Sequence, residues 1–86
     1  MIYPNPVTDQ FNISFQESIT NPVEWSLIDY SGKEVLKGAL QQGTKTKNIK
    51  TEALPSGIYL YRLAAGGKLI DTKRLIFTRQ TIYGLN

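Results

Sequence analysis

The amino-acid sequence predicts an all-β protein, an immunoglobulin-like antiparallel β-sandwich of about seven short strands. Short segments alternate apolar and polar side chains, as strands with one buried face do. Turn residues separate these segments at nearly regular spacing, and no segment keeps the period of a helix. A small barrel stays open as the alternative, because alternation does not decide whether a sheet closes. We expect extended segments at residues 2–3, 10–16, 23–27, 33–40, 44–50, 57–65 and 68–77.

Prolines and polar residues bound the first three segments. Residues 2–3 lead into the Pro-Asn-Pro run at 4–6, where each proline fixes its own φ and biases the preceding residue away from helix. Every second side chain of residues 11–15 is apolar, which predicts one buried face. Residues 23–27 repeat this pattern after a second proline.

A turn joins the third segment to the fourth. Asp29 can accept hydrogen bonds from the backbone ahead of it, and Gly32 can take a positive φ. Residues 33–40 are extended but less regular, and Gly38 interrupts them. Residues 44–50 are polar and rich in lysine, which predicts a strand at the edge of a sheet.

The last two segments flank Gly66 and Gly67, which are typical of a two-residue hairpin turn. The large apolar side chains of the whole set suffice to fill a layer between two sheets. The expected core residues are Phe11, Ile13, Phe15, Trp25, Leu27, Val35, Ile49, Leu54, Tyr59, Tyr61, Leu63, Leu75 and Phe77.

The length and the charge limit what this chain can be. Its 86 residues predict one small domain over residues 1–77, followed by a tail or strand extension over residues 78–86. The net charge of +3 is spread along the chain rather than gathered in a basic patch, so no nucleic-acid partner is expected. No apolar run approaches the roughly 20 residues that a membrane helix needs.

The residue types also argue against an enzyme. The chain has no cysteine and no histidine, which removes thiolate and imidazole metal ligands and the commonest general base. Its serines therefore have no histidine to activate them. Its acidic residues lie mostly at turns or on outward strand positions, where a solvated surface is a better interpretation than a catalytic pair. We expect no catalytic residue, no metal site and no cofactor.

Four short elements follow one another along the chain. They are Pro-Asn-Pro at 4–6, Asp-x-x-Gly-Lys at 29–33, Leu-x-x-Gly-x-Tyr at 54–59 and a basic-apolar strand at 73–77. Each element alone is common, but their order and spacing resemble the type A C-terminal sorting domain of the bacterial type IX (Por) secretion system. Residues 78–86 depart from this pattern, because members of that family usually stop soon after the last strand.

The resemblance implies a non-catalytic sorting signal at the C-terminal end of a larger exported cargo protein. In the family, outer-membrane secretion machinery recognises the folded domain, and a cell-surface sortase-like peptidase commonly removes it. The implied route crosses the periplasm to the outer membrane, the cell surface or the medium. The residues that the resemblance marks for recognition are Pro4, Asn5, Pro6, Gly32, Lys33, Gly57, Tyr59, Lys73 and Arg74.

Two other hypotheses concern partners. The chain could be an accessory sandwich that binds carbohydrate or protein beside a secreted enzyme or adhesin, and an exposed Trp25 or Tyr61 would favour the carbohydrate form. Open sheet edges could also accept a partner strand or pair two copies into a homodimer.

Overall fold

The computed structural model describes residues 1–51 and 54–78, and within them it contains strands but no helix, hence no helix able to cross a membrane. The strands are β1 (Ile2–Tyr3), β2 (Gln10–Ser14), β3 (Val23–Asp29), β4 (Glu34–Leu40), β5 (Thr46–Lys50), β6 (Gly57–Ala65) and β7 (Lys68–Phe77). They confirm the predicted all-β class. Apart from Thr78, the predicted tail at residues 78–86 lies outside the described residues.

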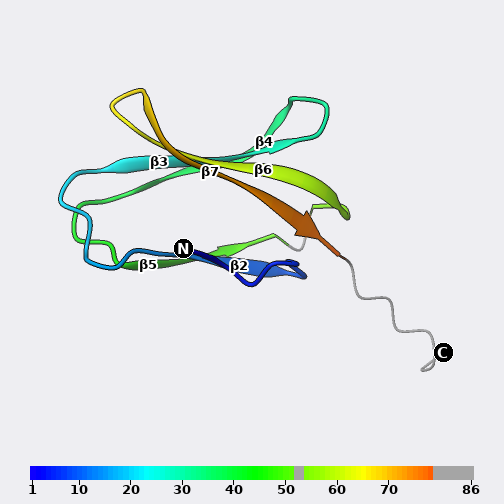
Figure 1. Ribbon diagram of the computed structural model, residues 1–86, viewed down its shortest axis with the longest axis horizontal. Helices are drawn as coiled ribbons and strands as arrows, with labels where there is room; N and C mark the ends of the chain where they lie inside the picture. Colours follow the sequence, from blue (N-terminus) through cyan, green and yellow to red (C-terminus); the bar gives the residue numbers. More distant parts are fainter. Residues whose placement is uncertain (52–53, 79–86) are drawn as a thin grey trace.

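The strands form two antiparallel sheets that lie face to face (Figure 1). The smaller sheet has the order β1-β2-β5 and the larger one the order β4-β3-β6-β7. This arrangement is the predicted sandwich rather than a closed barrel, and β5 lies at an edge, as its lysines indicated. The fourth strand pairs with the third, whereas in an immunoglobulin constant-type sandwich it belongs to the opposite sheet.

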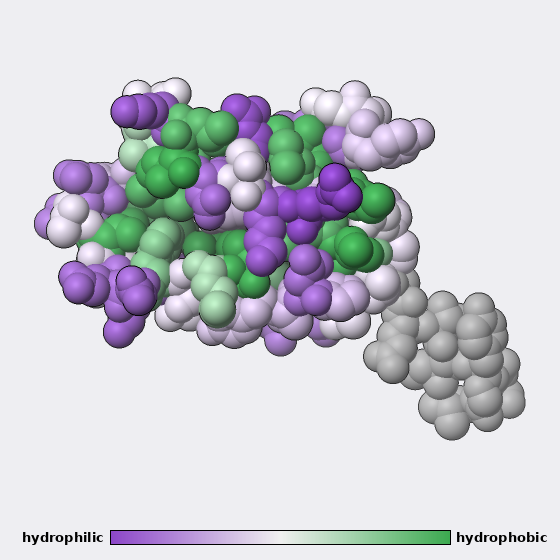
Figure 2. Space-filling view, viewed as in Figure 1, coloured by the Kyte–Doolittle hydropathy of each residue, from purple (hydrophilic) through white to green (hydrophobic). Residues whose placement is uncertain are grey.

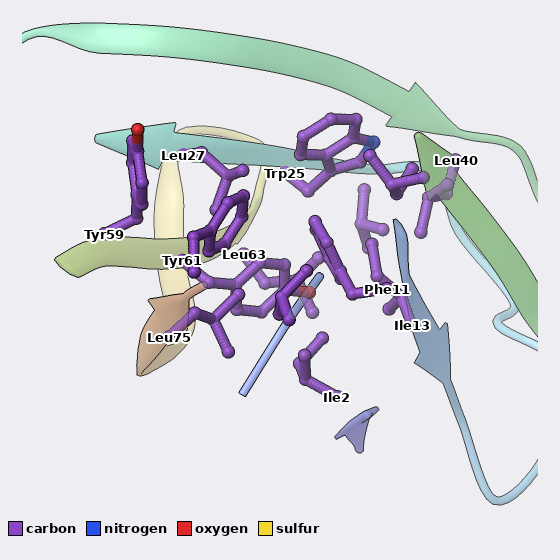
Figure 3. Close-up of a cluster of buried hydrophobic side chains, with 14 residues drawn as sticks. Ile2, Phe11, Ile13, Trp25, Leu27, Leu40, Tyr59, Tyr61, Leu63 and Leu75 are labelled. Carbon is purple, nitrogen blue, oxygen red and sulfur yellow. The ribbon is translucent and has the colours of Figure 1, made fainter. Parts of the chain in front are cut away.

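The core lies between the sheets and draws side chains from both (Figure 3). Its buried apolar residues are Ile2, Val7, Phe11, Ile13, Val23, Trp25, Leu27, Leu40, Ile49, Tyr59, Tyr61, Leu63, Leu75 and Phe77. The alternating positions of β2, β3 and β6 therefore point inward as predicted. Because successive side chains of a strand point to opposite faces, the residues between these buried positions face solvent.

The expected core differs from the observed one at its margin. Phe15, Val35 and Leu54 are only partly buried, because each lies beyond the end of a strand or at the edge of the larger sheet. Four residues outside the expected core are buried instead, namely Ile2, Val7, Val23 and Leu40. Val7 is buried because it forms a bridge with Phe77, 70 residues later, and a local pattern does not contain such a contact.

Candidate recognition site

The four sequence elements meet at one end of the sandwich. Along the paired strands, Asp29 lies opposite Tyr59, and Gly57 lies opposite Phe77. An isolated parallel bridge then joins Phe77 to Val7, directly after the Pro-Asn-Pro run. The β3–β4 turn, the beginning of β6 and the end of β7 accordingly share this end of the molecule (Figure 1). We call it the motif end.

Asn5 ties the beginning of the chain to its last strand. Its Nδ2 donates to the carbonyl oxygen of Arg74 over 3.3 Å, and its Oδ1 accepts from the backbone N–H of Ile76 over 3.0 Å. Val7 continues the contact: its N–H donates to Ile76 O over 2.7 Å, and its carbonyl accepts from Thr78 over 2.8 Å. The side-chain amide of Asn5 thus imitates a peptide group and extends the pairing along the outer edge of β7.

The tie predicts a local effect of removing the Asn5 amide. We expect Asn5→Ala to cost about 1–2 kcal/mol of unfolding free energy, because two hydrogen bonds are lost where water can replace part of each. Asn5→Asp keeps the acceptor for Ile76 but sets a carboxylate oxygen against the Arg74 carbonyl oxygen, so it should also destabilise the domain. Amide hydrogen exchange measures the effect directly, since the Ile76 N–H should exchange faster in Asn5→Ala. Unchanged protection of Ile76, relative to an Asn21→Ala control on an exposed loop, would contradict the tie.

Asp29 organises the turn between β3 and β4. Its Oδ1 accepts from the Ser31 hydroxyl over 2.6 Å, from the Ser31 N–H over 2.9 Å and from the Lys33 N–H over 3.0 Å. Gly32 has a φ of 92°, a left-handed conformation that glycine adopts readily. The predicted turn chemistry is therefore confirmed at both residues. The side chain of Lys33 stays exposed beside it.

The hydrogen bond from the Ser31 hydroxyl and that from the Lys33 backbone lower the pKa of Asp29. A carboxyl group with a lowered pKa is ionised at neutral pH and is suited to accept hydrogen bonds rather than to act as an acid. Because the folded-state pKa lies below the ordinary value, this stabilisation is present above that value and is lost as the pH falls through the lowered one. Asp29 is a structural residue of the turn.

Gly57 and Tyr59 begin β6 at the same end. The ring of Tyr59 is buried against Phe77, with 4.4 Å between ring centroids. Its hydroxyl donates to the carbonyl oxygen of Pro55 over 2.7 Å. The Leu-x-x-Gly-x-Tyr element therefore closes on itself, and Tyr59 fixes the approach of the chain to β6.

The two basic side chains of the last strand point away from each other. Lys73 lies opposite the buried Tyr61, and Arg74 lies opposite Leu60, so their side chains leave β7 on opposite faces. Both are exposed, but only Arg74 is next to the Asn5 contact. The structure thus brings the Pro-Asn-Pro run, Gly57, Tyr59 and Arg74 together around β7. Lys73 leaves β7 on the other face, and Lys33 lies in the β3–β4 turn at the same end.

Other sites suggested by the sequence find little support in the geometry. Trp25 and Tyr61 are 7% and 1% exposed, so neither offers a ring on which a sugar could stack. An open hollow of about 530 Å³ lies on the larger sheet, where Glu24 and Glu34 are accompanied by Lys37 and Arg62. No metal-binding group of acidic residues occurs within residues 1–51 and 54–78.

Sequence reasoning missed a set of outward-facing apolar residues near the motif end. Ile58 and Leu60 alternate with the buried tyrosines of β6, and Ile76 lies between two buried residues of β7. Their exposed fractions are 52%, 40% and 44%. A signal for them was present, because the first residues of β6 are apolar on both faces, whereas a half-solvated strand alternates.

Comparison with known proteins identifies the overall pattern. The family model described as "Secretion system C-terminal sorting domain" matches residues 1–78, which includes all four sequence elements. No individual curated protein matches the chain significantly.

Proposed function

The chain belongs to the secretion system C-terminal sorting domain family of type IX secretion, and we propose that it carries an upstream cargo protein across the outer membrane and is then removed. A domain of this family is a C-terminal sorting signal attached to an exported cargo, and the family is not a catalytic one. The observation that supports the proposal most is the match over residues 1–78, because it covers the whole described fold.

We propose the following route for the cargo. The cargo passes through the periplasm, the outer-membrane machinery binds the folded domain, and a sortase-like peptidase at the cell surface cuts the linker before Ile2. The sandwich of residues 1–77 is the part that is recognised. Its recognition residues are Pro4, Asn5, Pro6, Gly32, Lys33, Gly57, Tyr59, Lys73 and Arg74, some by contact and others by holding the motif end in shape.

Edge strands give a second route to association. In the larger sheet, β4 lies at one edge and β7 at the other, and residues 5–7 cover the C-terminal part of β7. A homodimer formed by strand addition would therefore use β4, the first half of β7, or the edges of the smaller sheet, β1 and β5. Molecular mass in solution would detect such a homodimer independently of export.

Export of a reporter tests the sorting function. A reporter with an N-terminal signal peptide and residues 1–86 at its C-terminus should reach the cell surface or medium of a bacterium that has the type IX machinery. The same fusion should stay in the periplasm of a strain that lacks the machinery. Deletion from Lys73 onward removes most of β7 and should abolish export. Equal export of the reporter with and without residues 1–86 would refute the proposal.

A further inference from the structure

The outer face of the larger sheet exposes a continuous apolar patch at the motif end. Ile58 and Ile76 are direct cross-strand partners on β6 and β7. Leu60 lies two residues along the same face of β6, and its partner on β3 is the half-buried Ile28. Cross-strand partners have side chains about 5 Å apart, so these four residues form one surface. We call it the apolar patch.

Two arginines border this patch on the side of β6 and β7. Arg74 is the cross-strand partner of Leu60, and Arg62 follows Leu60 on the same face of β6. Both are exposed, and among residues 1–51 and 54–78 neither guanidinium forms an ion pair. Glu34 lies opposite Ile28 across the patch from Arg74, and with Glu24 it lines the hollow that Arg62 also borders. The patch is thus positively charged along one border.

The sequence elements of the motif end hold the patch in place. Ile28 directly precedes Asp29 of the β3–β4 turn, and Ile58 lies between Gly57 and Tyr59. Asn5 binds the backbone of both Arg74 and Ile76 through its side-chain amide. Asn5, Gly57 and Tyr59, which the sequence marks for recognition, therefore shape the backbone beneath one exposed surface.

We propose that the apolar patch and its two arginines are the surface with which this domain docks on a protein of the secretion machinery. The occupant is an apolar protein surface that carries carboxylates opposite Arg62 and Arg74. Exposed apolar side chains contribute binding free energy when a partner covers them, and arginine forms two parallel hydrogen bonds with a carboxylate. Arginine is enriched among the few residues that dominate a protein interface, and the contacts around such residues exclude water. This inference rests on the proposed sorting function.

Two glutamate substitutions on the patch and one matched control test the docking surface. Ile58→Glu puts a charge into the patch, and Arg74→Glu reverses the charge at its border. Ile70→Glu is the control, because Ile70 is 53% exposed against 52% for Ile58 but lies near the other end of β7. Each variant is made in the reporter fusion with residues 1–86, and its thermal unfolding is compared with that of the parent.

We expect export to fall at least about tenfold for Ile58→Glu and for Arg74→Glu, and to change less than about twofold for Ile70→Glu. Unfolding temperatures close to the parent value would show that the loss is one of docking. If Ile58→Glu unfolds, the decision falls to Arg74→Glu, whose side chain is exposed and forms no ion pair within the described chain.

Several results would overturn the inference. Normal export of both patch variants would remove the docking surface while leaving the sorting function intact, whereas a parent fusion that is not exported at all would overturn both. A parent dimer that Ile58→Glu dissociates, with export unchanged, would assign the patch to a second copy of this chain. If the domain bound anionic phosphatidylglycerol vesicles and Arg74→Glu abolished that binding with export unchanged, the patch would be assigned to a lipid surface.

Figure 2 shows apolar side chains interspersed with hydrophilic ones on the β7 side of the molecule.

Discussion

Replacing Phe11 by alanine is expected to lower the free energy of unfolding by about 3–5 kcal/mol. Phe11 is fully buried, and its ring packs edge-on against Trp25 and Tyr61, with 6.3 Å between centroids in each case, and against Phe77 at 6.4 Å. Phe11 belongs to the smaller sheet, whereas its three aromatic neighbours belong to the larger one (Figure 3). Alanine would leave a cavity that rigid strands on both sides cannot fill.

The loss is large relative to the stability available. Domains have about 0.05–0.15 kcal/mol of stability per residue, which is about 4–13 kcal/mol for a chain of 86 residues. Phe11→Ala should therefore lose a large share of the stability of the domain and unfold at a lower denaturant concentration, which circular dichroism during denaturant titration would measure. If the machinery reads the folded domain, the reporter fusion should also lose export.

Phe15→Ala is the matched control for this change. Phe15 lies four residues later in the same alternating pattern but is only partly buried, just beyond the end of β2. Its truncation should cost distinctly less than that of Phe11. Equal losses at the two positions would contradict the central place of Phe11 in the core.

Local chemistry explains what could be predicted from the sequence. Alternation along β2, β3 and β6 predicts the buried faces because the period of a strand is fixed by its backbone. The Asp29 turn and the Gly66-Gly67 hairpin need only residues that are neighbours in the chain. The family resemblance rests on these same local signals, which is why it extends over the whole described fold.

Contacts between distant segments explain what could not be predicted. Val7 is buried because it pairs with Phe77, 70 residues later, and Asn5 lies beside Arg74 for the same reason. The pairing of β4 with β3 follows from a choice of sheet that alternation does not encode. The candidate residues could thus be named from the sequence, but their convergence at the motif end required the structure.

Gly38 is a second case in which a local interpretation was incomplete. In the sequence it interrupts the segment that becomes β4, but in the structure it is the cross-strand partner of Trp25. A Cβ built on Gly38 would lie 2.7 Å from Nε1 of the indole and 2.9 Å from its Cε2. The indole therefore covers the glycine backbone, an arrangement in which an aromatic ring compensates for a missing side chain in a strand.

This contact predicts that Gly38→Ala destabilises the domain although alanine suits a strand better than glycine does. We expect a loss of about 1–3 kcal/mol, because the new methyl group must displace the indole from a packed site. The emission of Trp25, the one tryptophan of the chain, should shift to longer wavelength as the ring gains contact with water. Ala39→Val, on the neighbouring exposed position of β4, is the control and should leave the emission unchanged.

A double-mutant cycle separates the clash with Trp25 from any general effect on β4. In a Trp25→Leu background the smaller side chain leaves room for a Cβ, so Gly38→Ala should then be neutral or stabilising. The coupling between the two positions should be about 0.5–3 kcal/mol, as is typical of residues in contact. A loss that is the same in both backgrounds would show that Gly38 is needed for the β4 backbone itself. If Gly38→Ala lowers the free energy of unfolding only when Trp25 is present, then the packing of Trp25 on Gly38 is what joins β4 to the larger sheet at this point.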